Sequence, residues 1–225
     1  MPPPRATHHH PSRVLGIVLA AGAGVRYGRP KALVDGWLAH AVETLLAGGC
    51  APVMVVLGAR AEEARALVPA EARVVVARDW ETGMGASLRA GLAAAVGTDV
   101  DTALVSLVDL PGLTPAAVAR VATVARACGP AGLVQATYGG VPGHPVALGR
   151  GHWQGVAGLA RGDHGARDYL RGRSLLRVEC GDVADGQDVD VPEPAGASDA
   201  APARGAADRD LSGDRAERTA ENQGR

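Results

Sequence analysis

The sequence predicts an α/β fold, with a doubly wound, mostly parallel sheet covered by helices on both faces in three α/β/α layers. Short apolar runs alternate with segments of helical periodicity over the first half of the chain, the pattern of successive βαβ units. The first run, VLGIVLA at residues 14–20, is continuously apolar, as expected of a strand that is covered on both faces. A glycine-rich loop follows it directly, at the edge of the sheet where such folds bind ligands.

The regular part of the chain contains four predicted strands and four predicted helices. The strands are expected at residues 14–20, 53–57, 74–77 and 102–108. The helices are expected at residues 37–47, 61–68, 86–96 and 115–127. The first helix ends at Gly48-Gly49, and the fourth strand ends at Asp109. This alternation predicts that the four strands are parallel.

The later part of the chain is less regular. Two apolar segments flank Gly139-Gly140, which predicts either a hairpin or an excursion from the sheet. The segments expected here are strands at 133–138, 145–148 and 174–178, and short helices at 152–159 and 166–170. Residues 1–12, rich in proline and histidine, are predicted to be a flexible arm, and residues 195–225 a disordered tail. A single domain is therefore expected over residues 13–194.

Composition excludes several classes of protein. The chain has 225 residues, 47% hydrophobic and 21% charged, with a net charge of −1, so it can bury a core and has no electrostatic reason to bind nucleic acid. No apolar run reaches the roughly 18 residues of a membrane span, and the N-terminus lacks the apolar stretch of a signal peptide. Cys50, Cys128 and Cys180 are far apart and odd in number, which favours a reducing, cytoplasmic location.

The glycine-rich loop at residues 20–31 is the first candidate binding site. Its glycines allow close approach of a phosphate to backbone N–H groups, and Arg26 and Lys31 add positive charge. Lys31 is the only lysine among the 23 lysine and arginine residues of the chain, which favours a chemical role for it. Because the loop lacks GK[ST], it is not a Walker loop.

Two kinds of nucleotide remain candidates for this loop. Gly22, Gly24 and Gly28 form a stretched G-x-G-x-x-x-G, compatible with a dinucleotide and an oxidoreductase, and Arg60 after the second strand suits the 2′-phosphate of NADP. However, a dinucleotide turn passes directly into a helix, and Pro30 interrupts that path. A long basic loop that ends in Pro-Lys fits a nucleoside triphosphate better.

Carboxylates that follow predicted strands are candidate metal ligands. Asp109 stands at the end of a central strand, where one carboxylate can hold Mg²⁺ beside a triphosphate. Asp188 and Asp190, near the end of the predicted domain, are candidates for a second ligand. Helix capping by Asp109 and turn formation by the later pair are the structural alternatives.

Six ordered motifs make the chain similar to a known family. LAAGAGVRYGRPKAL at residues 19–33 resembles the signature LAAGxGxRxGxPKxL of the MobA-like nucleotidyltransferases. The other motifs are WETGMGASLRAGL (80–92), VDLP (108–111), GHPV (143–146), GDHGAR (162–167) and DVDVPE (188–193). The resemblance covers about residues 13–193 and looks closest to the molybdenum cofactor cytidylyltransferases. It implies the Rossmann-like nucleotidyltransferase fold.

The resemblance implies roles for particular residues. Those implied to bind the nucleotide are Ala20, Ala21, Gly22, Ala23, Gly24, Arg26, Lys31, Gly83, Ser87, Leu88 and Arg89. Lys31, Arg26 and Asp109 would be catalytic, and Asp109 and Asp190 would bind Mg²⁺ with Asp188 as a neighbour. His144 and Asp163 would face the acceptor pocket.

The implied reaction moves a nucleoside monophosphate onto a phosphorylated acceptor and releases pyrophosphate. In this family an Ala-Ala-Gly loop goes with cytidine, so residues 20–22 favour CTP. Molybdopterin is the first candidate acceptor, and another phosphorylated metabolite or a sugar phosphate is the alternative. Two other functions remain open on this fold: an NAD(P)H-dependent oxidoreductase, and a non-catalytic nucleotide-binding partner of a molybdenum enzyme.

Overall fold

A seven-stranded sheet forms the centre of residues 13–191, the part of the chain that the computed structural model describes. Its strands are β1 (Val14–Ala20), β2 (Val53–Leu57), β3 (Ala72–Val76), β4 (Thr102–Leu107), β5 (Leu133–Tyr138), β6 (Val141–Gly149) and β7 (Leu176–Glu179). The α-helices are α1 (Trp37–Ala47), α2 (Ala61–Arg65), α3 (Met84–Val96), α4 (Pro115–Cys128), α5 (Trp153–Leu159) and α6 (Arg167–Leu170). The predicted arm, tail and domain end at residue 194 lie outside the described residues and stay predictions.

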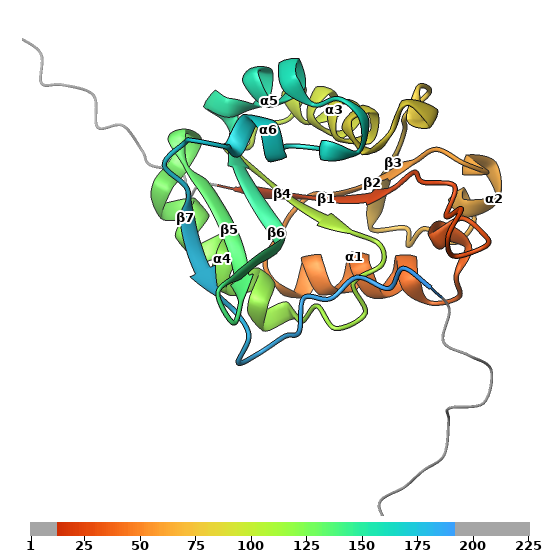
Figure 1. Cartoon of the computed structure of the whole chain (residues 1–225), viewed down its shortest axis with the longest axis horizontal. Coiled ribbons are helices and arrows are strands. Elements are labelled where there is room, and N and C mark those ends of the chain that lie inside the picture. The colour runs from red at the N-terminus through yellow and green to blue at the C-terminus, as the bar shows by residue number, and fades with distance from the viewer. Residues whose placement is uncertain (1–12, 192–225) are drawn as a thin grey trace, which may run out of the picture. The chain divides into compact units, whose positions relative to one another are not determined.

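The sheet has the order β3-β2-β1-β4-β6-β5-β7 (Figure 1). β1, β2, β3 and β4 are parallel to their neighbours, as the alternating pattern predicted. β6 lies between β4 and β5 and is antiparallel to both, whereas β7 is parallel to β5. The predicted doubly wound, mostly parallel sheet is therefore confirmed.

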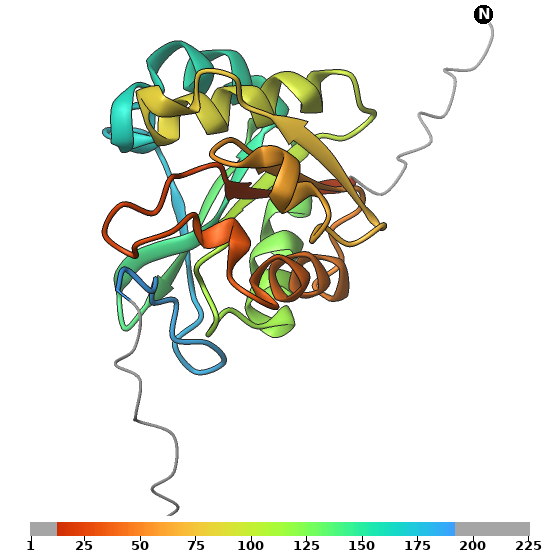
Figure 2. The same cartoon turned by 90° about the vertical axis from the view of Figure 1, so that its right-hand side faces the viewer.

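Helices cover both faces of the sheet, so the three predicted layers are present. α1 and α4 lie on one face and α3, α5 and α6 on the other, as the two views at right angles show (Figures 1 and 2). Val14 and Val18 of β1 belong to the core cluster under α1 and α4, and Leu15 and Ile17 belong to the cluster under α3 and α5. Because both faces of β1 are buried, its sequence is apolar without alternation. Within the described residues, no helix has the length and apolar character needed to cross a bilayer.

Two elements differ from their predicted extent by three or more residues at one end, and the other bounds agree within two residues. The helix expected over 61–68 ends at Arg65, because Leu67 and Val68 donate to carbonyls three residues back and Pro69 disfavours α conformation before it. The strand expected over 145–148 begins earlier, at Val141, because the chain pairs with β5 across an irregularity in register. The segment around Gly139-Gly140 is thus a hairpin, which decides between the two predicted alternatives.

Residues 180–191, here called the closing segment, return from β7 across the carboxyl edge of the sheet. The Arg120 guanidinium of α4 donates two hydrogen bonds to Asp182, at 2.6 and 2.9 Å, and Thr114 Oγ1 donates to the Val183 carbonyl at 3.0 Å. Farther along, the Val189 N–H donates to the Asp109 carbonyl at 3.0 Å. These hydrogen bonds hold the closing segment against α4 and beside the end of β4.

Replacing Thr114 by alanine is expected to lower the free energy of unfolding by about 1–2 kcal/mol. Thr114 is the N-cap of α4: its Oγ1 accepts from the Ala117 N–H while donating to the closing segment. Chemical denaturation measures the loss. Thr123→Ala, on the exposed face of the same helix, is the matched control and should change stability by less than about 0.5 kcal/mol. Equal effects of both substitutions would contradict the capping role.

Glu179 holds the β5–β6 hairpin against the end of β7. Its carboxylate accepts hydrogen bonds from the N–H groups of Gly181, Gly140 and Gly139 and from the Thr137 hydroxyl, at 2.8–3.0 Å. These bonds, led by the one from Gly181, lower the pKa of Glu179 to about 2. The ionised form is therefore the one that the fold stabilises.

This pKa predicts how stability depends on pH. The contribution of Glu179 is complete above about pH 4.5, the ordinary pKa of glutamate, and is lost as the pH falls towards about 2. Glu179→Gln should be less stable than wild type at neutral pH, with a shallower loss between these two values. Urea denaturation across this range measures it, with Glu71→Gln in the exposed turn before β3 as control. Parallel profiles for wild type and Glu179→Gln would contradict the assignment.

Candidate active site

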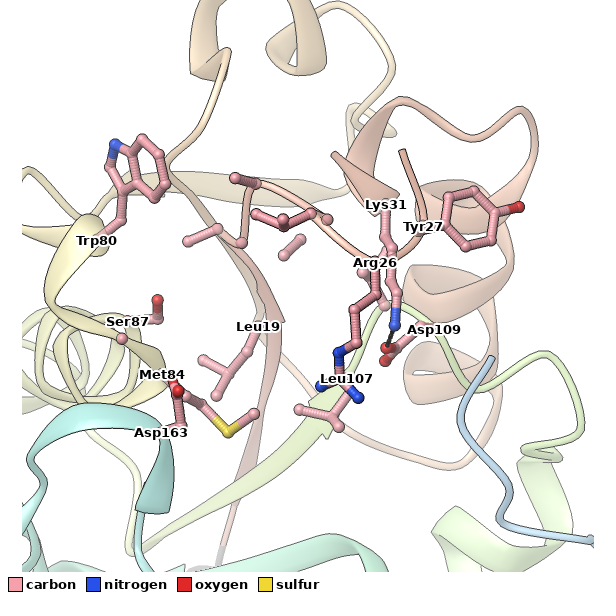
Figure 3. Close-up of a pocket in the computed structure, with 18 of the residues that line it drawn as sticks. Leu19, Arg26, Tyr27, Lys31, Trp80, Met84, Ser87, Leu107, Asp109 and Asp163 are labelled. Atoms are coloured by element: carbon pink, nitrogen blue, oxygen red, sulfur yellow. Dashed lines mark hydrogen bonds and ion pairs between the residues drawn. The ribbon is translucent and has the colours of Figure 1, made fainter. Parts of the chain in front are cut away.

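A cavity of about 550 Å³ opens at the carboxyl edge of the sheet, beside the ends of β1 and β4. This volume suits a small-molecule ligand. Figure 3 shows Trp80 and Ser87 on one side of it and Lys31, Arg26 and Asp109 on the other. The residues that line it are Leu19, Ala20, Ala21, Gly22, Ala23, Gly24, Val25, Arg26, Tyr27, Lys31, Trp80, Glu81, Gly83, Met84, Ser87, Leu107, Val108, Asp109, Asp163, Asp188 and Asp190.

The predicted glycine-rich loop forms one wall of this cavity. Gly24 has φ = 63°, and a Cβ atom there would lie 1.9 Å from the Arg29 carbonyl oxygen, so only glycine fits. The Gly28 N–H donates to the Gly24 carbonyl at 2.8 Å and closes the loop on itself. This compact turn carries the chain from buried β1 to Lys31, at the start of a short 3-10 helix.

The opposite wall is formed where α3 begins. Gly83 precedes α3 with φ = 104°, and a Cβ atom there would lie 2.5 Å from the Gly162 carbonyl carbon. The absence of a side chain at Gly83 therefore lets the 3-10 turn Gly162–His164 lie directly against the start of α3. That contact brings Asp163 to the cavity, opposite the glycine-rich loop.

Charged side chains from three distant parts of the sequence meet where the glycine-rich loop ends at Lys31. Lys31 Nζ donates to Asp109 Oδ2 at 2.6 Å and to Asp190 Oδ1 at 3.1 Å, and Arg26 donates to Asp190 Oδ2 at 2.8 Å. The side chains of Lys31 and Asp109 are 16% and 12% exposed, so water screens this ion pair little. Arg26, at 79% exposure, contributes a more weakly held charge.

The ion pairs shift the pKa values of this cluster. Burial lowers the pKa of Lys31, but hydrogen bonds and charge from Asp109 and Asp190 outweigh it, and the net direction is upward. The hydrogen bond from Lys31, followed by its charge, lowers the pKa of Asp190. Lys31 is therefore a permanent cation beside an ionised carboxylate at neutral pH, which suits charge neutralisation rather than proton transfer.

Three carboxylates form a candidate metal site. One oxygen each from Asp109, Asp188 and Asp190 can be chosen so that all lie within 4.8 Å of one another. Asp188, which the sequence left as a less certain neighbour, is thus part of the group. Hard divalent cations such as Mg²⁺ and Mn²⁺ prefer carboxylate oxygens, and Mg²⁺ usually takes one or two of them with phosphate oxygens and water. The donor set fits such a cation.

Two predicted nucleotide-binding residues lie elsewhere. Leu88 is 2% exposed and packs in the core cluster under α3, because it lies about 100° around the helix from Ser87. Arg89 donates to the Ala160 carbonyl at 2.6 Å and pairs with Asp79, and it does not line the cavity. Their side chains support the wall rather than forming it, whereas Ser87 does face the cavity.

Sequence reasoning gave no role to eight residues of the cavity lining: Leu19, Val25, Tyr27, Trp80, Glu81, Met84, Leu107 and Val108. Trp80 and Met84 lie within the WETGMGASLRAGL motif, so that motif was the signal that could have identified them. Tyr27 lies in the glycine-rich loop and packs against Trp37 of α1 with ring centroids 5.5 Å apart. This aromatic contact connects the loop to the core.

A second cavity of about 720 Å³ adjoins the first, since Met84, Leu107, Asp163 and Asp188 line both. It contains His144 and Asp163, the two residues predicted to face an acceptor. Burial lowers the pKa of His144, against the opposing charges of Asp109 and Asp188, so the imidazole is neutral at neutral pH. The two predicted acceptor residues thus line the same cavity, which Asp188 of the candidate metal site also lines.

A glycine-rich loop and a lysine in contact with strand-end carboxylates, beside one cavity, are features of enzymes that transfer nucleotidyl groups, and the chain is a nucleotidyltransferase. The family model described as the MobA-like NTP transferase domain matches residues 16–179. The chain belongs to this family.

Three individual proteins are similar to the chain. "Nicotine blue oxidoreductase" of Paenarthrobacter nicotinovorans is 40% identical over 195 residues, 80% of this chain and 93% of that protein. Rv0371c of Mycobacterium tuberculosis H37Rv has a TM-score of 0.69 at 28% identity, with 81% and 94% of the two chains covered. A nucleotidyl transferase of Methanothermobacter thermautotrophicus, Mth528, has a TM-score of 0.60 at 25% identity, with 75% and 87% covered.

A further structure of Rv0371c was determined in complex with manganese. It has a TM-score of 0.62 at 25% identity and covers 75% of this chain and 89% of that chain. Manganese in a structural relative agrees with the acidic group formed here by Asp109, Asp188 and Asp190.

Proposed function

We propose that this protein transfers a nucleoside monophosphate, CMP from CTP, onto a phosphorylated acceptor and releases pyrophosphate. The observation that carries the proposal is the meeting of Lys31 with Asp109 and Asp190 beside the glycine-rich loop. A cation over a phosphate, next to carboxylates that suit a divalent metal, is what in-line attack at phosphorus requires. Molybdopterin is the acceptor that we propose first.

In the proposed reaction, some residues of the chain bind the triphosphate and others neutralise the charge on the reacting phosphate. N–H groups of the glycine-rich loop and the exposed Arg26 guanidinium would hold the outer phosphates. Lys31 would contact the α-phosphate, where an acceptor phosphate oxygen forms the new P–O bond as the bond to pyrophosphate breaks. An ionised acceptor phosphate needs no general base, so positioning and charge account for the rate. This agrees with a lysine that stays protonated.

Asp109, Asp188 and Asp190 would hold Mg²⁺. The bound ion neutralises phosphate charge and aligns the triphosphate with the attacking oxygen. The Lys31 ammonium contacts the same carboxylate cluster, at 2.6 Å from Asp109 and 3.1 Å from Asp190. The lysine is therefore positioned at the boundary between the metal ligands and the glycine-rich loop.

An NAD(P)H-dependent oxidoreductase is the second candidate, favoured by the name of the relative that is 40% identical. The local geometry supports it less. Arg60, the residue suited to a 2′-phosphate, pairs with Glu63. The loop leads into a short 3-10 helix at Lys31, and α1 begins only at Trp37, so no long helix starts at the glycines.

A thermal-shift panel separates the two candidates. CTP, GTP, ATP and NADPH are each added with and without Mg²⁺, and a pyrophosphate-release assay with molybdopterin follows. The transferase proposal expects stabilisation by CTP that depends on Mg²⁺, and pyrophosphate release only when the acceptor is present. Stabilisation by NADPH alone, with NADPH oxidation in the presence of nicotine blue, would replace it with the oxidoreductase.

We also propose a cytoplasmic location. Cys50, Cys128 and Cys180 form no disulfide within residues 13–191, and Cys50 and Cys180 are buried. Burial raises the pKa of Cys50 to about 12, so this thiol is inert and suits packing. Free thiols of this kind support a reducing compartment.

A further inference from the structure

Part of β6 lies outside the paired registers of that strand. The register of β6 with β4 ends at Val146, and its register with β5 is interrupted between Val146 and Pro142. Residues 143–145 therefore have no partner residue in either register. His144, which lines the second cavity, is in the middle of this interval. Irregularities of this kind redirect the side chains of a strand and are frequent beside functional sites.

Two side chains of β5 hold the backbone of this interval. The Gln135 amide donates to the Gly143 carbonyl at 3.3 Å, and the Tyr138 hydroxyl donates to the His144 carbonyl at 2.6 Å. Burial raises the pKa of Tyr138 to about 12, so the hydroxyl keeps the proton that it donates at neutral pH. The shorter of the two bonds therefore fixes the backbone that carries the His144 imidazole.

The ring of Tyr138 also contacts the closing segment. Gly186 has φ = 65°, and a Cβ atom there would lie 2.1 Å from Cε2 of the Tyr138 ring, so glycine leaves room for the ring. Asp188, a candidate metal ligand, follows two residues later, and the Val189 N–H donates to the Asp109 carbonyl at 3.0 Å. Tyr138 thus packs on the segment that leads to the candidate metal site.

Tyr138 itself lines neither of the two cavities, so it can act on a ligand only through the residues that it contacts. Its hydroxyl contacts His144 and its ring contacts Gly186. His144 and Asp188 both line the second cavity. The two contacts are separable by substitution, because phenylalanine keeps the ring and loses only the hydroxyl.

We propose that Tyr138 is a positioning residue, whose hydroxyl holds His144 at the second cavity and whose ring holds the closing segment, and with it Asp188, at the candidate metal site. The inference rests on the proposed function, in which the second cavity receives the acceptor and Asp188 contributes to metal binding. Loss of the hydroxyl should therefore affect the acceptor alone, and loss of the ring should affect the metal as well.

Tyr138→Phe tests the hydroxyl. In pyrophosphate release with Mg·CTP, KM for molybdopterin should rise by about tenfold, the scale of one lost hydrogen bond, with kcat little changed. Histidine NMR signals of the full chain, assigned with His144→Gln, should show a shift of the His144 imidazole. Calorimetric affinity for Mn²⁺ should stay within about twofold of wild type, because the ring remains.

Tyr169→Phe is the matched control for this substitution. Tyr169 is buried, its hydroxyl is 2.8 Å from His152 Nδ1, and it lines neither cavity. Its variant also loses one hydrogen-bonded hydroxyl, but KM for molybdopterin and the His144 signals should stay as in wild type. Unchanged KM and unchanged His144 signals in Tyr138→Phe would overturn the role of the hydroxyl.

Tyr138→Leu and Gly186→Ala test the ring. Each should weaken Mn²⁺ binding by about tenfold, the loss expected when a residue that orients a metal ligand is removed. The double variant should lose less than the two single losses multiplied together, because leucine leaves space for the new methyl group. Tyr169→Leu should bind Mn²⁺ as wild type does. Circular dichroism checks that each variant is folded.

Wild-type Mn²⁺ affinity in Tyr138→Leu, or an equal loss in Tyr138→Phe and Tyr138→Leu, would overturn the role of the ring. Absence of pyrophosphate release from the wild-type chain would overturn the proposed function instead. The histidine signals and the Mn²⁺ titration need neither nucleotide nor acceptor, so they would still decide whether Tyr138 positions His144 and the closing segment.

Discussion

Replacing Lys31 by arginine is expected to slow nucleotidyl transfer by about 10²–10³-fold, nearly as much as replacement by alanine. Lys31 reaches both Asp109 and Asp190 as a compact point charge in a shielded position. Arginine keeps the charge, but its planar fork is larger and directs its donors differently. The composition makes this substitution informative, because Lys31 is the only lysine among the 23 lysine and arginine residues of the chain.

Pyrophosphate release with Mg·CTP and molybdopterin measures the rate, and calorimetry measures CTP affinity. Affinity should fall much less than the rate, because Arg26 and the loop N–H groups still hold the bound triphosphate. Arg29→Ala, at an exposed position in the same loop, is the matched control and should retain turnover. Turnover of Lys31→Arg at nearly the wild-type rate would mean that the lysine is only one more basic residue, and its catalytic assignment would be withdrawn.

Replacing Asp109 or Asp190 by asparagine is expected to abolish metal-dependent turnover. The two carboxylates belong to one group with Asp188, within 4.8 Å, so either substitution removes a charged ligand from a shared ion. The double variant should be little worse than either single variant, because residues that act as a unit are not additive. Affinity for Mn²⁺ alone should fall by about 100-fold or more in each variant, beyond the loss typical of an outer-sphere change.

Calorimetric titration of Mn²⁺ into the full chain measures this affinity without a nucleotide or acceptor. Asp99→Asn, an exposed residue in the loop before β4, is the control and should bind Mn²⁺ as wild type does. Circular dichroism separates loss of binding from loss of fold. Rate losses of the two single variants that add on a logarithmic scale would argue against one shared ion.

The components of the candidate site were predictable one by one. The loop could be recognised because a turn such as that at Gly24 admits only glycine, and Asp109 because a carboxylate stands directly after an apolar strand. Leu88 and Arg89 do not line the cavity, for a local reason as well. A motif names consecutive residues, but successive residues of a helix point about 100° apart, so Ser87 faces the cavity while its neighbours do not.

The amino-acid sequence was enough to predict the parallel arrangement of β1–β4, the position of the glycine-rich loop and the presence of carboxylates after strands. These features depend on local periodicity, backbone conformation and burial, which neighbouring residues dictate. Local patterns do not predict that Lys31 contacts Asp109 and Asp190, residues 78 and 159 positions away, or that Arg177 of β7 lines the second cavity. Antiparallel insertion of β6 between β4 and β5, and the position of the closing segment, depend on the free energy of packing between distant segments. No local pattern encodes that free energy.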